Sequence, residues 1–255
     1  MSNCPRCGKE VAEEDIYCKN CGENLRKPEG PTVTPGQVGA MDHLTTGFRL
    51  ATGKPMVFAP ALIGGIISLL ISRTSSGLMG AYRWQFWQSW GEIPFSDPRF
   101  SSLFLLGGLI SLIGSIITYI LNFASIDMSR DAYLDQPLDF MGSINYVLRR
   151  IFTFIGASIV GAFLSITIIL IPVVILMFVI LVIDETGIGN AISKAFSVLT
   201  RDLGDIIIIL VVAIVGSIVL GLVPFISSLL TACLNVIIGL AFIDIYFQYK
   251  RQQYI

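Results

Sequence analysis

Two very long uncharged segments dominate the second half of this chain. Ile151–Ile183 runs for 33 residues and Ile206–Ile243 for 38 residues without a charged side chain. Met56–Ser72 and Ser101–Ser125 are shorter uncharged runs. Apolar runs of this kind are typical of membrane-spanning helices, each of which needs about 20 residues. Only 14% of the 255 residues are charged, against about 25% in soluble domains. The chain is therefore predicted to be an all-α polytopic membrane protein.

The two longest runs are each predicted to form a helical hairpin. Each is too long for one ordinary span, and each contains one proline, Pro172 or Pro224, a residue that suits a helix start or a turn. A single kinked helix over residues 151–183, and five spans in all, is the alternative. Hairpins in both runs give six predicted spans, at about 56–72, 101–125, 151–170, 172–184, 206–222 and 225–244.

The first 25 residues contain the sharpest chemical motif. Two C-x2-C-G frames are separated by ten residues and supply Cys4, Cys7, Cys18 and Cys21. Four thiolates are the ligands of a tetrahedral structural zinc ion, and the glycine after each pair allows a left-handed turn. Iron in a rubredoxin-like site and a redox dithiol are the alternatives. We predict one structural Zn²⁺ in a ribbon over residues 1–25, then a flexible linker, 26–40, and a transmembrane domain, 41–255.

Thiol chemistry and charge both predict a cytosolic N-terminus. Free thiolates that bind a metal need a reducing compartment. With six spans, 14 of the 17 Lys and Arg residues lie in cytosolic segments, and the other three lie in an outer loop, 73–99. The positive-inside rule favours this orientation. The protein is predicted to lie in the cell membrane with both termini in the cytosol.

A repeated pattern runs through the membrane part. A short amphipathic stretch with basic residues precedes each predicted pair of spans: Leu44–Lys54, Met141–Arg150 and Ala191–Arg201. Every second span ends in Ile-Asp, at Asp127, Asp184 and Asp244. The pattern predicts three repeats, each an interfacial helix followed by a hairpin, and internal repeats are a common plan in membrane proteins.

These motifs resemble two groups of known proteins. The pattern CPRCG…IYCKNCG resembles the short zinc ribbons that precede many archaeal and bacterial membrane proteins. The element AISKAF at 191–196 and the repeated elbow pattern resemble poorly characterised six-span proteins related to the membrane domain of glycerophosphodiester phosphodiesterases. In those phosphodiesterases the catalytic domain is a separate soluble barrel, for which this chain has no room. The resemblance therefore implies the membrane fold without the activity.

Asp127, Asp184 and Asp244 have two interpretations. In the ordinary one, Asp127 and Asp184 cap the next helical stretch and lie in water, because aspartate is a common helix cap. In the functional one, the three carboxylates converge as an acidic ring in a cytosolic vestibule that attracts cations or basic segments.

Trp84, Trp87 and Trp90 have the spacing of one helix face within the predicted outer loop. Tryptophan is enriched where a membrane meets water, so an interfacial helix on the outer leaflet is predicted. The alternative is a binding surface for lipid or glycan.

The sequence contains no recognisable catalytic constellation. His43 is the only histidine, and it is expected to be solvated beside Asp42 without a partner for a catalytic dyad. Residues 1–27 hold five basic and five acidic side chains, so nucleic-acid binding is unlikely. The prediction is a non-enzymatic integral membrane protein that contacts the lipid bilayer and binds a protein partner through its zinc ribbon. A channel, transporter or lipid-handling protein with a path through the six helices is the alternative.

Overall fold

The computed structural model describes residues 2–4, 7–11, 17–22, 39–88, 98–223 and 226–253. Near the N-terminus, strands β1 (Ser2–Asn3) and β2 (Glu10–Val11) pair antiparallel, with Ser2 opposite Val11. The other regular elements in the described ranges are helices: α1 (Ala40–Gly53), η1 (Pro55–Phe58), α2 (Ala59–Gln88), α3 (Pro98–Tyr133), α4 (Phe140–Arg149), α5 (Ile151–Ser165), η2 (Ile168–Leu170), α6 (Ile171–Ile183), α7 (Ile188–Arg201), α8 (Leu203–Gly221) and α9 (Ser227–Gln253). The predicted all-α class is confirmed.

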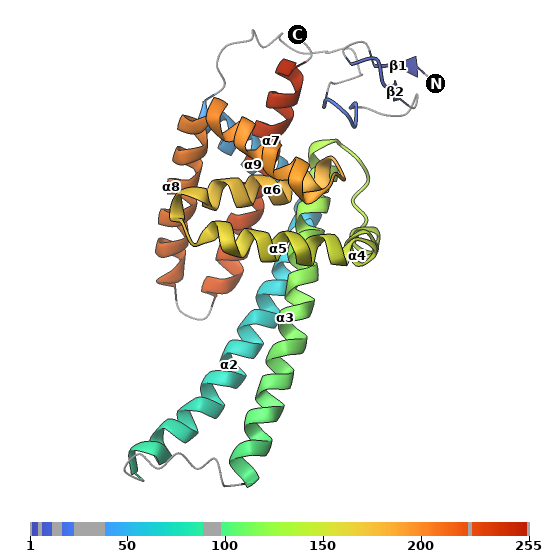
Figure 1. The fold of residues 1–255 in the computed structure, drawn as a ribbon. Coiled ribbons are helices and arrows are strands. Elements are labelled where there is room, and N and C mark those ends of the chain that lie inside the picture. The colour runs from blue at the N-terminus through green and yellow to red at the C-terminus, as the bar shows by residue number, and fades with distance from the viewer. Residues whose placement is uncertain are drawn as a thin grey trace.

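The helices follow one another in three groups of similar design (Figure 1). In each group a short helix, α1, α4 or α7, precedes two further helices. The short helices contain nearly all of the three amphipathic stretches and bury one face. In α7 this face consists of Ala191, Ala195, Val198 and Leu199, whose spacing is that of a single helical stripe. The element order is that of the predicted interfacial helix followed by a hairpin.

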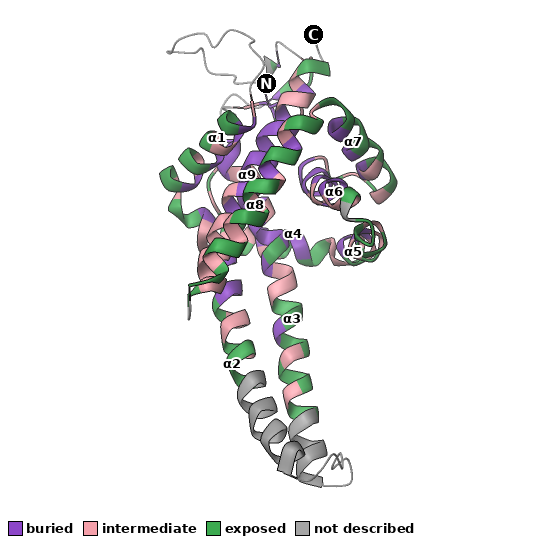
Figure 2. Cartoon of the chain, turned by 90° about the vertical axis from the view of Figure 1, so that its left-hand side faces the viewer, coloured by how far each residue is buried: buried purple, intermediate pink, exposed green. Residues whose placement is uncertain are grey.

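Helices α2 and α3 form a long antiparallel arm that extends away from the other helices (Figures 1 and 2). With 30 and 36 residues, they are far longer than the predicted spans 56–72 and 101–125. Gly114 lies at their contact, where an added Cβ atom would lie 2.0 Å from Cδ1 of Ile71 and the Ile71 side chain would have to shift. Large apolar side chains such as Leu70 and Leu109 point outward and are more than half exposed. Such an arm suits a lipid environment better than water.

Helices α5 and α6 lie side by side and cross the direction of the arm (Figure 1). With η2 and the residues between them, they make up the run Ile151–Ile183, for which a hairpin was predicted. Helix α6 has 13 residues, of which ten are buried. At 1.5 Å per residue it extends only about 20 Å, too short for the hydrocarbon core of about 30 Å. Short apolar helices of this length are typical of buried core elements.

Within the described ranges, four helical segments are long and apolar enough to cross a membrane: Pro55–Thr74, Leu105–Tyr133, Leu203–Gly221 and Ser227–Gln253. Helices α4 and α5 give a fifth if they form one span, although they are bent by 74° at the residue between them. The six predicted spans are thus not confirmed. The difference arises at α5 and α6. Helix α5 has only 15 residues and qualifies as a span only together with the bent α4, and the 13 residues of α6 are mostly buried inside the protein.

The core lies at the end of the bundle where α3, α6 and α9 meet (Figure 2). Helix α1 packs along α9 at Gly47, where an added Cβ would lie 2.6 Å from the carbonyl oxygen of Ile237. Glycine is therefore required for this close approach of two backbones. The N-terminal strands and the end of α9 lie together, opposite the tip of the arm (Figure 1).

Candidate metal centre and its docking on the helical bundle

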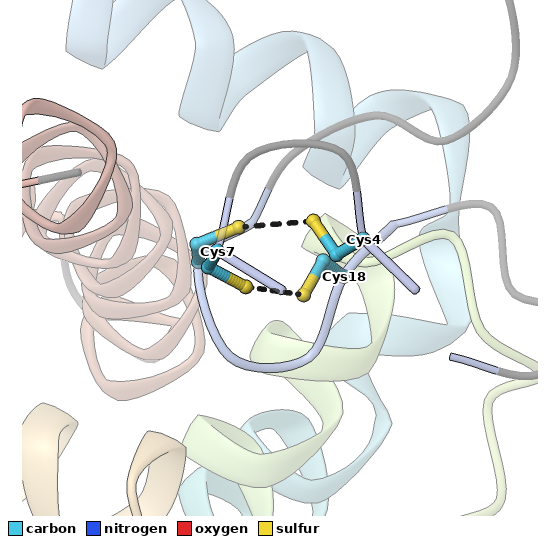
Figure 3. Close-up of side chains that lie close together, drawn as sticks. Cys4, Cys7 and Cys18 are labelled. Atoms are coloured by element: carbon cyan, nitrogen blue, oxygen red, sulfur yellow. Dashed lines mark hydrogen bonds between the residues drawn. The ribbon is translucent and has the colours of Figure 1, made fainter. Parts of the chain in front are cut away.

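The four predicted metal ligands meet in one small cluster (Figure 3). Their Sγ atoms all lie within 4.8 Å of one another. Sγ of Cys4 is 3.7 Å from that of Cys21, and Sγ of Cys7 is 3.5 Å from that of Cys18. A tetrahedron with metal–sulfur bonds of about 2.3 Å has sulfur–sulfur edges of about 3.8 Å. The cluster therefore has the size that a four-coordinate metal ion requires.

The backbone around the cysteines repeats the same turn twice. The amide of Gly8 donates to the carbonyl of Cys4 at 3.0 Å, and that of Gly22 donates to the carbonyl of Cys18 at 2.7 Å. The φ angles of these glycines are 70° and 71°, a left-handed conformation that glycine adopts without steric cost. The two C-x2-C-G frames of the sequence thus form two equivalent knuckles.

The thiols are suited to metal binding. Cys4, Cys18 and Cys21 are buried, and Cys7 is partly exposed. Burial opposes ionisation of Cys7, but hydrogen bonds from the backbone of Lys9 and the side chain of Asn20 lower its pKa to about 6. Thiolates are the metal-binding form of cysteine. Among the residues that the structure describes, this is the one group of three or more His, Cys, Asp or Glu side chains placed to hold a metal ion.

The second knuckle packs directly on α9. A Cβ atom added at Gly22 would lie 2.5 Å from Cδ1 of Phe247. The Phe247 ring in turn stacks on Tyr133 of α3, with centroids 4.9 Å apart. Arg251 donates to the carbonyl of Gly22 at 2.8 Å, and Tyr17 packs against the main core. The ribbon is therefore docked on the bundle through both aromatic and polar contacts.

The prediction that His43 is solvated is wrong. Its side chain is only 4% exposed, and its Nδ1 atom lies 2.6 Å from Oδ2 of Asp244. The two residues are 201 positions apart and meet because α1 packs along α9. A signal was present in the sequence, because His43 falls on the same helical face as Ala40, Gly47 and Ala51, all small and buried.

A chain of polar contacts joins this buried pair to the ribbon. The hydroxyl of Tyr133 donates to Oδ1 of Asp244 at 2.8 Å. The same hydroxyl lies 3.4 Å from a guanidinium nitrogen of Arg251, which also donates to the carbonyl of Gly22. Helices α1, α3 and α9 are thereby connected to the metal-binding turn.

Asp184 lies beyond the end of α6, outside the candidate spans. Its carboxylate, 8% exposed, accepts hydrogen bonds from Lys250 at 2.8 Å, from Lys194 and from Tyr246. Burial raises the pKa of Asp184, but the charge of Lys250 and these hydrogen bonds together lower it below its usual range. The expectation of a solvated cap for the next helix is wrong, because Gly187 is the N-cap of α7.

Asp127 lies inside the continuous helix α3, so it does not cap a helix either. It is 3% exposed and forms an ion pair of 2.8 Å with Arg130. Arg130 also donates to the carbonyl of Val182 at the end of α6. The structure thus brings all three predicted aspartates to the ribbon end of the bundle. Each of them pairs with partners of its own within the protein, and the acidic ring stays a prediction.

The tryptophan cluster is described only in part. Trp84 and Trp87 belong to the last turns of α2, whereas Trp90 lies outside the described residues. Part of the segment 73–99, predicted as an outer loop, is therefore helical, with residues 73–88 continuing α2. The shared aromatic face remains a prediction.

No family model, curated protein or solved structure matches this chain. The resemblance of the membrane part to the phosphodiesterase-associated domain therefore stays a prediction. The cysteine cluster is consistent with the resemblance of the N-terminus to a zinc ribbon.

Proposed function

We propose that this chain is an integral membrane protein whose ribbon holds one structural Zn²⁺ ion and acts as a protein-interaction module. The observation that carries the proposal is the cluster of four Sγ atoms within 4.8 Å on a ribbon that packs against α9. Zinc is favoured over iron because only ten residues separate the knuckles, which leaves little chain to shield iron from water. The zinc ion would fix the two knuckles in the conformation that fits Phe247.

We place the ribbon and the end of α9 in the cytosol and the tip of the arm outside. The N-terminal strands and the end of α9 lie at the same end of the molecule, which supports an even number of crossings (Figure 1). Thiolates need a reducing compartment, and most Lys and Arg residues lie in segments on the ribbon side in this orientation. We assign the protein to the cell membrane on the same grounds.

The ribbon already binds one protein surface, that of its own helix α9, and this supports the interaction role. Gly22 packs against the ring of Phe247, and its carbonyl accepts a hydrogen bond from the guanidinium of Arg251. Its balanced charge offers no basic surface for nucleic acid. We propose a non-enzymatic role in which the ribbon binds its own bundle and presents its outer surface to a partner protein. In this reading the buried His43–Asp244 pair is structural.

Metal content tests the first part of the proposal. The full-length protein, purified in detergent, is expected to contain one zinc ion per chain by mass spectrometry of the metal. Cys4→Ser together with Cys21→Ser should abolish it. Cys233→Ser is the matched control, because Cys233 lies in α9 outside the cluster, and it should retain the full zinc content. Iron as the bound metal, or no metal in the unaltered protein, contradicts the proposal.

Cross-linking in intact membranes tests the interaction role. A photoreactive residue at Lys9, which is exposed on the ribbon, is expected to link to the chain's own bundle and to a separate protein. The separate link should disappear in the Cys4→Ser, Cys21→Ser variant while membrane insertion is unchanged. If cross-links form only to the chain's own bundle, the partner role is contradicted, and the ribbon only covers the ends of the helices.

A further inference from the structure

We propose that α5, η2 and α6 form a hairpin that is inserted into one leaflet of the bilayer and does not cross it. Its outer face and its tip lie against the acyl chains of that leaflet. The choice of leaflet rests on the orientation proposed above, which makes it the cytosolic one. The hairpin covers the uncharged run Ile151–Ile183, and polar segments precede and follow it.

Both ends of this hairpin lie at one place. Arg150, directly before α5, donates to the carbonyl of Leu181 at 3.1 Å and to that of Thr186 at 3.2 Å. Tyr146 of α4 donates to the carbonyl of Val182 at 3.2 Å. These donors satisfy carbonyls at the end of α6, where a positive charge also complements the helix dipole. A segment whose two ends are held together crosses the membrane either twice or not at all.

The helices of the hairpin are too short for two crossings. Helix α5 has 15 residues and α6 has 13, which correspond to lengths of about 22 and 20 Å, whereas each crossing requires about 30 Å. Both helices also cross the direction of the arm, so their lengths are not directed along the helices that span (Figure 1). The hairpin therefore does not reach the opposite surface of the membrane.

The outward face of α5 is apolar and exposed. One stripe of the helix, which contains Phe154, Ala157 and Gly161, is buried inside the protein. Another stripe points away from the protein, with exposed fractions of 43–85%, and consists of Phe152, Ile155, Ile159, Phe163 and Ile166. A helix that is apolar on all sides suits a protein core or hydrocarbon, and α5 is only partly in the core. Lipid is the occupant that fits this stripe, because α8, a candidate span with only 11% of its apolar window buried, shows the same outward exposure.

The tip of the hairpin is apolar as well. Residues 166–171 read Ile-Thr-Ile-Ile-Leu-Ile, whereas turns in water are rich in Gly, Pro, Asn, Asp and Ser. Ile166 and Ile169 are 77% and 83% exposed. Thr167 donates both its hydroxyl, at 3.0 Å, and its amide, at 3.3 Å, to the carbonyl of Leu164. Hydrogen bonding within the segment is what a turn in hydrocarbon requires. The tip is therefore expected among acyl chains and not in water.

Cysteine labelling in cells that express the full-length protein tests this inference. Arg149→Cys lies before the hairpin, Gly187→Cys after it and Ile169→Cys at its tip, each in a Cys233→Ser background. All three positions are exposed, and a Cβ at Gly187 meets nothing within 4 Å. A membrane-impermeant maleimide is applied to intact cells and to inside-out vesicles. Mass spectrometry of the labelled peptides separates these sites from the ribbon cysteines.

The two ends and the tip should react differently. Arg149→Cys and Gly187→Cys are expected to react fully in inside-out vesicles and not in intact cells. Ile169→Cys should react in neither preparation and become reactive only in detergent. Val211→Cys is the matched control, because Val211 lies in the middle of the candidate span α8 and is 52% exposed. It should be protected in the same way as Ile169→Cys.

Three results would overturn the inference. Reaction of Ile169→Cys in intact cells would indicate two full crossings, and its reaction in inside-out vesicles would place the hairpin in water on the cytosolic side. Reaction of Arg149→Cys and Gly187→Cys on opposite sides would indicate a single bent span.

Failure of the proposed function gives different results. If both ends react only in intact cells and Ile169→Cys stays protected, the one-leaflet hairpin is supported and the proposed orientation is reversed. Absence of zinc from the purified protein contradicts the proposed metal centre, whereas the labelling of the hairpin would still support this inference.

Discussion

The ribbon end of the bundle and the α2–α3 arm are stabilised in opposite ways. At the ribbon end, polar side chains such as those of Asp127, His43 and Asp244 are almost fully buried, and each has a partner within the protein. Along the described part of the arm, large apolar side chains face outward (Figure 2). The arm is therefore stabilised mainly by contact of its apolar side chains with lipid. The ribbon end is stabilised by specific polar contacts and, as proposed, by a metal ion.

The largest effect is expected from loss of the metal, which should unfold the ribbon and leave the helices intact. Cys4→Ser with Cys21→Ser removes the metal, and metal binding contributes about 10–16 kcal/mol to the folding of small zinc modules. The ribbon should unfold and become sensitive to protease, while the helical signal in circular dichroism stays unchanged. Loss of the helical signal together with unfolding of the ribbon would show that the arm and the bundle also depend on the metal. That result would contradict the difference between the two regions.

Breaking the buried pair should have the next largest effect. Asp244→Ala leaves His43 and the hydroxyl of Tyr133 without their partner. Each buried polar group left unsatisfied costs about 1–3 kcal/mol, so the two groups together should lower the thermal midpoint by roughly 4–12 °C or more. Leu70→Ala is the matched change in the arm, where the side chain is 60% exposed, and it should shift the midpoint far less. Equal shifts would remove the contrast between the regions.

Helix α1 offers a pair of glycines that tests the packing of the ribbon end. Gly47→Ala places a Cβ 2.6 Å from a backbone oxygen of α9 and should destabilise the protein by about 1–3 kcal/mol. Gly53→Ala, in the last turn of the same helix, meets nothing within 4 Å and should be neutral or slightly stabilising. Thermal unfolding of both variants gives the comparison, and a neutral Gly47→Ala would contradict the close packing of α1 on α9.

The smallest effect is a pH dependence at Asp184. Its pKa is lowered in the folded protein, so its contribution to stability is present above the unfolded pKa of about 3.9 and is lost as the pH falls through the folded pKa. The difference in thermal midpoint between a protein with Asp184 and the same protein with Asp184→Asn should be constant from pH 7 to about pH 5 and shrink below about pH 4. Both proteins carry Cys4→Ser and Cys21→Ser, which excludes acid release of metal. A difference that grows on acidification contradicts the assigned contacts.

Local sequence pattern was sufficient for the parts that depend on local chemistry. The spacing of the cysteines and their glycines predicts the metal cluster, because each knuckle is built within a few residues. Uncharged length predicts membrane helices, and the amphipathic stretches predict α1, α4 and α7. In all these cases the determining residues lie close together in the chain.

The contacts that hold the ribbon end together could not be predicted in the same way. Gly22 meets Phe247 and Arg251 from the far end of the chain, and His43 meets Asp244 across 201 positions. Helix α6 was predicted to span because hydrophobicity does not distinguish a lipid environment from a protein core. Helix α6 differs from a membrane span in its short length of 13 residues and in its burial inside the protein.

The most direct test of the docked ribbon uses its two equivalent glycines. Gly8→Ala and Gly22→Ala impose the same backbone strain, since both φ angles are close to 70°, but only Gly22 lies against Phe247. The measurement is hydrogen exchange of residues 17–22 in the zinc-loaded protein, for both variants alone and combined with Phe247→Ala. The docked arrangement predicts faster exchange in Gly22→Ala than in Gly8→Ala, and it predicts that Phe247→Ala removes the difference. Equal exchange in the two glycine variants, with or without the phenylalanine, would contradict docking of the ribbon on α9.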